Sequence, residues 1–283
     1  MRSNKEIPSF DSVTPWGTYR PNLVVNALLS FGQKMPSSLS FLSKATRHPV
    51  KYWRNTSVDL RIWGLKMRLN PRGNISEQKL YTSPKGFDPM ELRFMQQFLA
   101  QGGVFFDIGA NAGVYSFWAH VCSNGRAKII SFEPDAEMRR RIDFNVAINE
   151  IETIKVLPYA LSDRDGLTEF YVNEGQRGTN SLERPTEGIA KRRQIQVQMR
   201  TLLTVINEQA ISNIDVMKID IEGHEPPVLR HFFANVPKES WPRLLIGEVQ
   251  HISAVDLEAL VPSDHYEVVF TTKLNTIWKK RSL

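Results

Sequence analysis

Cysteine is almost absent from this sequence, and long hydrophobic runs are absent altogether. Cys122 is the single cysteine, so neither an intrachain disulfide nor a cysteine-based zinc or iron–sulfur site can form. No apolar run reaches the roughly 18 residues that a membrane-spanning helix needs. Residues 1–11 lead into no long apolar region, which predicts that there is no secretory signal peptide. We therefore expect a cytoplasmic protein, either free or in peripheral contact with the inner face of the membrane.

The composition is otherwise ordinary for a globular protein. Of the 283 residues, 41% are hydrophobic and 23% are charged, which argues against disordered, collagen-like and coiled-coil chains. Prolines break the first 50 residues into short apolar stretches. We therefore predict an irregular, basic, partly helical extension over residues 1–56 and a single domain over residues 57–283.

Positive charge is concentrated near the N-terminus. Residues 1–80 contain 13 Lys and Arg against 4 Asp and Glu, whereas residues 81–283 contain 23 against 26. These cations show no RNA-motif spacing and no zinc-finger ligands accompany them, so we expect no nucleic-acid partner. Two alternatives are open. The basic segment is a solvated face of the domain, or it contacts an anionic membrane or a phosphorylated glycolipid, because the apolar stretch 22–31 lies beside it.

From residue 104 onward, short apolar strands alternate with helical segments. This alternation predicts an α/β fold in which a mostly parallel sheet is covered by helices on both faces. Ligands of such sheets bind at the carboxyl ends of the strands. The predicted strands cover residues 104–108, 128–132, 154–159, 214–219, 244–249, 267–270 and 276–279, and the predicted helices cover residues 114–121, 134–148, 201–209, 226–234 and 253–261.

Other segments stand outside this alternation. Residues 58–69 alternate apolar and polar side chains, which predicts a hairpin or a bent strand. Asp88 is expected to cap a helix that begins at Pro89. Residues 167–172 are typical of an added antiparallel strand. The polar residues 173–193 that follow form either a lid over the site or an exposed insertion.

A glycine-rich turn follows the strand predicted at 104–108. Asp107, Gly109, Asn111 and Gly113 lie there, and glycines let a ligand approach the backbone closely. The spacing G-x-x-x-G differs from the G-x-G-x-x-G of dinucleotide-binding proteins. A carboxylate at position 107 would repel a pyrophosphate, but it would attract a cofactor that carries ammonium and sulfonium groups. The turn therefore favours S-adenosylmethionine over NAD.

Glu133 ends the next predicted strand. An acidic side chain at this place can accept hydrogen bonds from two ribose hydroxyls of a nucleoside. The alternative is a helix-capping role, which Asp135 could fill instead. Because Asp107 and Glu133 stand at the ends of successive strands, the pair predicts nucleoside binding.

The sequence KIDIEGHE, residues 218–225, places several ionisable groups directly after a predicted strand. Burying such groups is costly unless they serve a purpose. Asp220, Glu222 and His224 are candidate general bases, and Glu248, at the end of the following strand, is a weaker candidate. A structural role in capping the next helix is the alternative. The same side chains could hold Mg²⁺ or Mn²⁺, but their spacing matches no recognised metal motif, so we predict no metal.

Five motifs occur in an order that resembles the FkbM family of S-adenosylmethionine-dependent methyltransferases. They are DIGANAGVYS at 107–116, SFEPD at 131–135, ALSDRDG at 160–166, TNSL at 179–182 and KIDIEGHE at 218–225. The resemblance spans residues 58–250 and gives no assignment to the first 55. It implies a class I methyltransferase fold, which is a Rossmann-like, mostly parallel sheet of seven strands whose last strand is antiparallel.

Carried over by position, the resemblance also implies where S-adenosylmethionine would bind. The implied residues are Asp107, Gly109, Asn111 and Gly113 for the methionine part, Glu133 for the ribose, and Ser162 and Asp163 for the adenine.

The expected reaction is methyl transfer to a hydroxyl, on a sugar of a glycolipid, a polysaccharide or a secondary metabolite, a substrate range that the resemblance implies. Two alternatives belong to other classes of protein. One is an NAD-dependent oxidoreductase or epimerase, which the glycine spacing and Asp107 disfavour. The other is a non-catalytic module on a methyltransferase fold that binds a membrane surface or nucleic acid.

Overall fold

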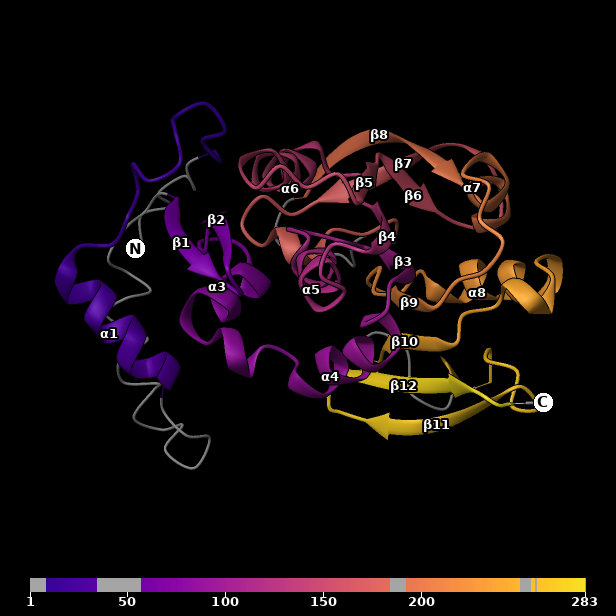
Figure 1. The fold of residues 1–283 in the computed structure, drawn as a ribbon. Helices are drawn as coiled ribbons and strands as arrows, with labels where there is room; N and C mark the ends of the chain where they lie inside the picture. Colours follow the sequence, from indigo (N-terminus) through magenta and orange to yellow (C-terminus); the bar gives the residue numbers. More distant parts are fainter. Residues whose placement is uncertain (1–8, 35–56, 184–191, 250–255, 258, 283) are drawn as a thin grey trace.

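The computed structural model describes residues 9–34, 57–183, 192–249, 256–257 and 259–282. Its central feature is a seven-stranded sheet with the strand order β11-β12-β10-β9-β3-β4-β5 (Figure 1). Strands β10, β9, β3, β4 and β5 run parallel, and β12 is antiparallel to both of its neighbours. The strands are β3 (Gly103–Ile108), β4 (Ala127–Phe132), β5 (Ile154–Leu157), β9 (Val216–Ile219), β10 (Leu244–Glu248), β11 (Tyr266–Thr271) and β12 (Asn275–Lys280).

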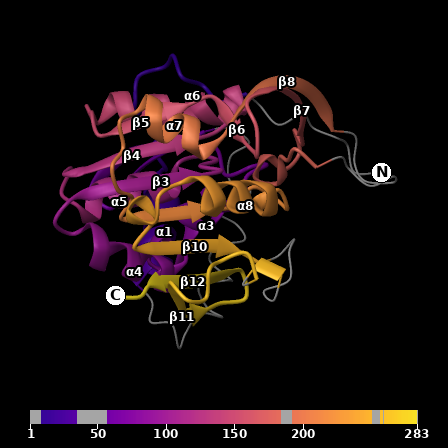
Figure 2. The same ribbon diagram turned by 90° about the vertical axis from the view of Figure 1, so that its right-hand side faces the viewer.

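This sheet is the predicted class I methyltransferase architecture, and the prediction is confirmed. The central strands are continuous apolar runs because helices cover both of their faces. One apolar core lies between the sheet and α4 (Pro89–Leu99), α5 (Val114–Cys122) and α6 (Ala136–Ile148). A second core lies on the opposite face, against α7 (Leu202–Glu208) and α8 (Glu225–Asn235). Figure 2 shows these two helices in front of the sheet. Of the helix predicted at 253–261, residues 253–255 and 258 lie outside the described residues, 256 and 257 are helical, and 259–261 are not.

A second, three-stranded sheet was missed in part by the sequence prediction. It consists of β6 (Tyr159–Leu161), β8 (Arg193–Arg200) and β7 (Gly166–Val172), in that order. The antiparallel strand predicted at 167–172 is confirmed as β7. Strand β8 was not predicted, although its sequence RQIQVQMR alternates polar and apolar residues with the period of a strand. Its many polar residues concealed it, because β8 is half exposed.

The start of the described chain and the segment 57–69 pack beside α6, since the Phe10 N–H donates to Glu137 and β2 contacts that helix. Strands β1 (Val58–Ile62) and β2 (Leu65–Leu69) form the predicted hairpin. Arg68, fully buried on β2, forms an ion pair with Asp59 at 2.7 Å. Its guanidinium also donates to the backbone carbonyl oxygens of Asp11, Thr14 and Pro15. One buried cation therefore attaches the start of the described chain to the domain.

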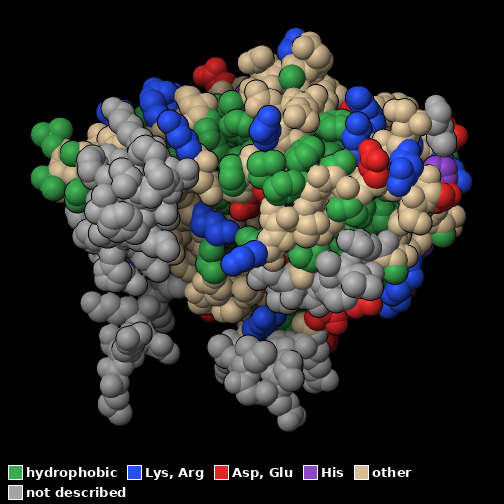
Figure 3. Space-filling view, turned by 90° about the horizontal axis from the view of Figure 1, so that it is seen from below, with side chains coloured by type: hydrophobic (Ala, Val, Ile, Leu, Met, Phe, Trp, Pro, Cys, Tyr) green, Lys and Arg blue, Asp and Glu red, His purple; other side chains and the backbone are tan. Residues whose placement is uncertain are grey.

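Helix α1 (Leu23–Lys34) projects at one edge of the molecule. Leu23 and Val24 are 88% and 69% exposed, and hydrophobic side chains protrude at that edge in Figure 3. In the described part of the chain, no helix is long and apolar enough to cross a membrane.

Two short segments complete the wall that faces the site. Helix α3 (Ile75–Thr82) begins at Asn74, whose side chain accepts a hydrogen bond from the backbone N–H of Glu77. A 3₁₀ turn, η2 (Pro84–Gly86), then leads to α4. Asp88 precedes α4 as predicted, but the expected cap is wrong, because its carboxylate makes no bond to the helix and accepts one from the Tyr115 hydroxyl at 2.9 Å instead.

Candidate active site

A cavity of about 310 Å³ lies at the carboxyl ends of β3, β4, β9 and β10. This is the edge at which parallel α/β sheets bind ligands. Its walls come from the turn after β3, the ends of β4, β9 and β10, strand β6, the residues after β7, the turn before β12, and the segment that contains α3 and the residues before α4. The polar side chains that line it are Ser76, Lys79, Asp88, Asn111, Tyr115, Glu133, Gln176, Arg177, Thr179, Asn180, Lys218, Asp220, Glu222, Glu248 and Asn275.

The turn after β3 is shaped by residues with positive φ. Gly109 has φ +79°, and a Cβ there would lie 1.9 Å from the carbonyl oxygen of Asp220. Only glycine therefore lets the loops after β3 and β9 approach each other. Asn111 is also left-handed, at φ 52°, and lines the cavity. Gly113 is placed differently from the expectation, because it does not line the cavity and instead packs against Ile142 at the start of α5.

Glu133 lies at the cavity wall with 5% of its surface exposed. Its carboxylate accepts hydrogen bonds from the backbone N–H groups of Asn111 and Asp135, each at 2.8 Å. Burial raises the pKa of Glu133 to about 8, because desolvation outweighs these two bonds. The alternative role, capping the next helix, is filled by Asp135, whose side chain accepts a hydrogen bond from the N–H of Glu137 at the start of α6. Glu133 therefore faces the cavity without serving as a cap.

Three carboxylates meet at the other side of the cavity. Asp220, Glu222 and Glu248 line it, and one carboxylate oxygen of each lies within 4.8 Å of the others. We call these residues the acidic trio. Burial and the neighbouring carboxylates raise the pKa of Glu222 to about 8 and that of Glu248 to about 10. The sequence ranked Glu248 below His224, and the structure reverses that order.

Lys218 and Asp107 lie behind the trio. The Lys218 ammonium is 2.9 Å from Asp220 Oδ2 and 4.8 Å from the centre of the Tyr115 ring. Asp107 was expected at the mouth of the site, but it is 1% exposed, does not line the cavity, and accepts a hydrogen bond from the Ser116 hydroxyl. Its charge faces the buried Lys218, which lowers its pKa, although burial raises it more. Asp107 therefore supports the wall of the site from behind.

His224 is separated from the two carboxylates with which it was grouped. Its Nε2 atom lies 2.9 Å from the Ser162 hydroxyl, and its Nδ1 atom lies 2.8 Å from Glu183. His224 does not line the cavity, whereas the sequence grouped it with Asp220 and Glu222, which do. The side chain turns away because the chain reverses at Glu222 and Gly223, where φ is 57° and 101°.

The residues expected beside the adenine also lie outside the cavity wall. Ser162 donates its backbone N–H to the carbonyl of Arg200, so that donor is already used. Asp163 pairs with Arg164 on the surface. The wall at this point is made instead by Tyr159, Ala160 and Leu161, which precede them on β6. The adenine contact implied for Ser162 and Asp163 stays a prediction, although neither residue lines the cavity.

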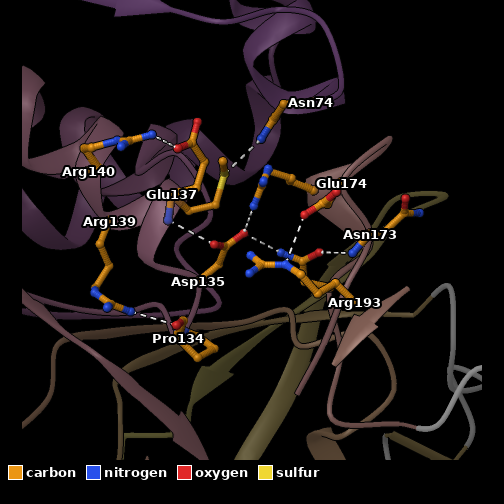
Figure 4. A network of polar contacts seen from close by, with 12 residues as sticks. Asn74, Pro134, Asp135, Glu137, Arg139, Arg140, Asn173, Glu174 and Arg193 are labelled. Carbon is orange, nitrogen blue, oxygen red and sulfur yellow. Dashed lines mark hydrogen bonds and ion pairs between the residues drawn. The ribbon is translucent and has the colours of Figure 1, made fainter. Parts of the chain in front are cut away.

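Residues 173–183, the described part of the polar segment after β7, cross the cavity. Asp135 accepts hydrogen bonds from Arg177 at 2.7 Å and from Asn180 at 2.9 Å. Figure 4 labels Asp135 and draws the bonds that its carboxylate accepts as dashed lines. On the trio's side, the Ser181 hydroxyl donates to the carbonyl of Glu222 at 3.1 Å. The segment is thus attached at both walls and lines the cavity between them, as the lid alternative requires. The rest of the predicted loop, residues 184–191, lies outside the described residues.

Sequence reasoning missed the wall made by α3 and the residues before α4. Lys79 and Asp88 line the cavity there, with 3.8 Å between their charged atoms, and Tyr115 binds Asp88 from α5. No spacing in the sequence connects these positions. The positive φ of Asp88, 34°, marks it as a residue held in place by its surroundings.

Comparisons with known proteins agree with this architecture. The family description "Methyltransferase FkbM domain" matches residues 107–266, which is more than half of the chain. Methyltransferase sdnD of Sordaria araneosa is 26% identical over 196 residues, which cover 57% of this chain and 73% of that protein. The AMB antimetabolite synthetase AmbE of Pseudomonas aeruginosa is 24% identical over 164 residues, which are 46% of this chain but 8% of the synthetase.

A solved structure, methyltransferase FkbM from Methylobacillus flagellatus KT, is similar with a TM-score of 0.41 and 14% identity, covering 72% of this chain and 54% of that one. The family match sets aside the oxidoreductase alternative, because it includes both the glycine-rich turn and the acidic segment. The chain belongs to the FkbM methyltransferase family.

Proposed function

We propose that the protein is an S-adenosylmethionine-dependent O-methyltransferase that acts on a hydroxyl of a sugar-containing acceptor. The observation that carries the proposal is that Glu133 and the acidic trio face one cavity from opposite sides. Glu133 offers carboxylate oxygens at the strand end where a nucleoside's ribose binds in α/β folds. The trio offers a proton acceptor where the second substrate would meet the cofactor.

The chain's residues fit the proposed cofactor. The cavity volume is in the range of small-molecule sites. Both Gly109 and Asn111 present backbone to it in left-handed conformations, so no side chain at position 109 blocks a ligand. Tyr159 and Leu161 supply an apolar wall on the side of Glu133, where a flat base would pack.

When bound, S-adenosylmethionine supplies a methyl group, and its S–CH₃ bond breaks as the acceptor's O–CH₃ bond forms, leaving a neutral thioether. The acceptor hydroxyl must lose its proton in the same step. Glu222 and Glu248 carry their own protons near neutral pH, since their pKa values are raised to about 8 and about 10. We therefore assign to Asp220 the role of accepting the proton that the acceptor hydroxyl loses. The Lys218 ammonium balances the charge of Asp220.

The end of the cavity that lies away from Glu133 has the side chains to bind a polyhydroxylated acceptor. Asp88, Lys79 and Asn275 offer hydrogen-bonding groups there, and Phe87 and Tyr115 offer aromatic surface. Hydroxyl groups can bind the polar side chains while the C–H face of a sugar ring packs on an aromatic ring. This combination favours a sugar over a wholly apolar acceptor.

The test has two stages. Titration calorimetry should first show binding of S-adenosylmethionine, with NAD binding undetectable. Hydroxylated sugars and glycolipid extracts are then screened for release of S-adenosylhomocysteine. With a confirmed acceptor, Asp220→Asn should lower kcat by roughly 10²- to 10⁴-fold and leave cofactor affinity nearly unchanged.

Two comparisons make the assignment falsifiable. His224→Ala should lower kcat far less than Asp220→Asn does, because the His224 side chain contacts Ser162 and Glu183 outside the cavity. Glu152→Gln, an exposed substitution on the surface, is the matched control. Full turnover by a folded Asp220→Asn enzyme would remove Asp220 as proton acceptor, and absence of cofactor binding would remove the whole proposal.

A further inference from the structure

We infer that the acidic trio is a binding site for one divalent cation, Mg²⁺ or Mn²⁺, which binds the acceptor's hydroxyl oxygen. This inference rests on the proposed function for its purpose, but the site itself can be tested without any methyl transfer. No residue spacing in the sequence indicates it. Asp220 and Glu222 follow β9, and the third member, Glu248, comes from the neighbouring strand β10.

Three acidic side chains share one part of the cavity wall. Their oxygens lie within 4.8 Å of one another, and burial together with the neighbouring carboxylates makes Glu222 and Glu248 hold protons when no cation is bound. Lys218 contacts Asp220 at 2.9 Å and balances its charge. Arg192 lies close enough to Glu222 to act on it through charge, but it does not line the cavity. A doubly charged cation would displace the protons of Glu222 and Glu248, because carboxylates bind a metal in their deprotonated form.

Glu248 provides an independent observation that points to a ligand. Its side chain is 9% exposed and lines the cavity, and its Oε2 atom has no hydrogen-bond partner among the residues that the structure describes. Buried carboxylate oxygens are nearly always satisfied by a donor or a metal. The Oε2 atom of Glu248 is therefore placed to bind a cation in the cavity together with the two neighbouring carboxylates.

The donor set matches hard divalent cations. Mg²⁺ and Mn²⁺ prefer oxygen ligands, and Mg²⁺ holds them at about 2.0–2.1 Å, so oxygens that share one Mg²⁺ lie up to about 4 Å apart. The separations within the trio, up to 4.8 Å, therefore need to close by less than about 1 Å. Mg²⁺ keeps several water ligands when few protein atoms bind it, and an acceptor hydroxyl can replace one of them.

The cation would also help the proposed reaction. A hydroxyl bound to it loses its proton more easily, because the metal stabilises the negative oxygen that results. Asp220 still accepts that proton, and the oxygen then forms the bond to the methyl group. The trio lies on the same side of the cavity as Asp88, one of the residues proposed to bind the acceptor. Lys218 contacts the ring of Tyr115, and the Tyr115 hydroxyl donates to Asp88.

The experiment titrates the full-length protein with Mn²⁺ alone and follows free Mn²⁺ by electron paramagnetic resonance. One Mn²⁺ should bind per chain, and Mg²⁺ should compete for it. Glu248→Gln and Glu222→Gln should each weaken Mn²⁺ binding by roughly tenfold or more, since even groups that only support metal ligands contribute 10- to 100-fold. Glu152→Gln, exposed and distant, should leave binding unchanged.

The outcomes separate the cation site from the proposed function. Wild-type protein that binds no Mn²⁺, or variants that all bind it equally, would overturn the cation site. Urea unfolding checks that each variant is folded, and the two variants in the trio make the result independent of either one. S-adenosylmethionine titrations on the same samples report the proposed function separately. Methyl transfer that persists at the full rate in EDTA would also overturn the cation site, while leaving the methyltransferase assignment intact.

Discussion

Glu133 should make the stability of the ligand-free protein depend on pH. Its pKa is raised from 4.5 to about 8, because the side chain is buried. Between these values the folded protein holds a proton that the unfolded chain releases, so the free energy of unfolding falls as pH rises from about 5 to about 8. One proton corresponds to a slope of about 1.4 kcal/mol per pH unit, or on the order of 4 kcal/mol over the window.

The substitution Glu133→Gln isolates this contribution. Glutamine has nearly the same shape and does not ionise, but its amide group can satisfy only one of the two backbone N–H groups, of Asn111 and Asp135, that Glu133 accepts from. At pH 5.5 we expect the variant to be less stable by about 1 kcal/mol. At pH 8.5 the order should reverse, because the wild type must then bury a charge.

Urea unfolding at pH 5.5, 7.0 and 8.5, without cofactor, measures the effect. The difference between the wild type and Glu133→Gln is the relevant quantity, since other buried carboxyls, such as Glu222, add the same slope to both proteins. Glu152→Gln, an exposed substitution, controls for the loss of one surface charge. Parallel stability curves for the wild type and Glu133→Gln would refute the link between burial and protonation at this residue.

Two further predictions concern the parts that surround the site. Arg177→Met removes the 2.7 Å ion pair with Asp135, so amide hydrogen exchange in residues 173–183 should speed up by roughly tenfold, while unchanged exchange would show that the pair does not hold the segment. We also propose that α1 contacts anionic membranes through its exposed residues Leu23 and Val24. Co-sedimentation with acidic vesicles should then weaken with salt and with the double serine variant, and equal binding to neutral vesicles would contradict it.

The sequence alone determined the order of the strands in the main sheet along the chain and the edge of that sheet at which the site lies. Apolar runs such as β3 and β10 are local signals, because a strand covered on both faces must be apolar along its whole length. Parallel strands also end at one edge of their sheet, so the positions of Glu133 and Asp220 after their strands suffice to predict that they meet there. The motifs around them were specific enough to indicate the family.

The tertiary structure decided which side chains face the cavity. Asp107 and His224 stand within the expected motifs, but one is buried behind the wall and the other points to Ser162. Side-chain direction after a strand depends on the φ angles of a few loop residues, here the left-handed Glu222, and these are set by packing. The position of Glu248 in the trio likewise depends on β9 and β10 pairing side by side, a contact between distant residues that no local pattern records.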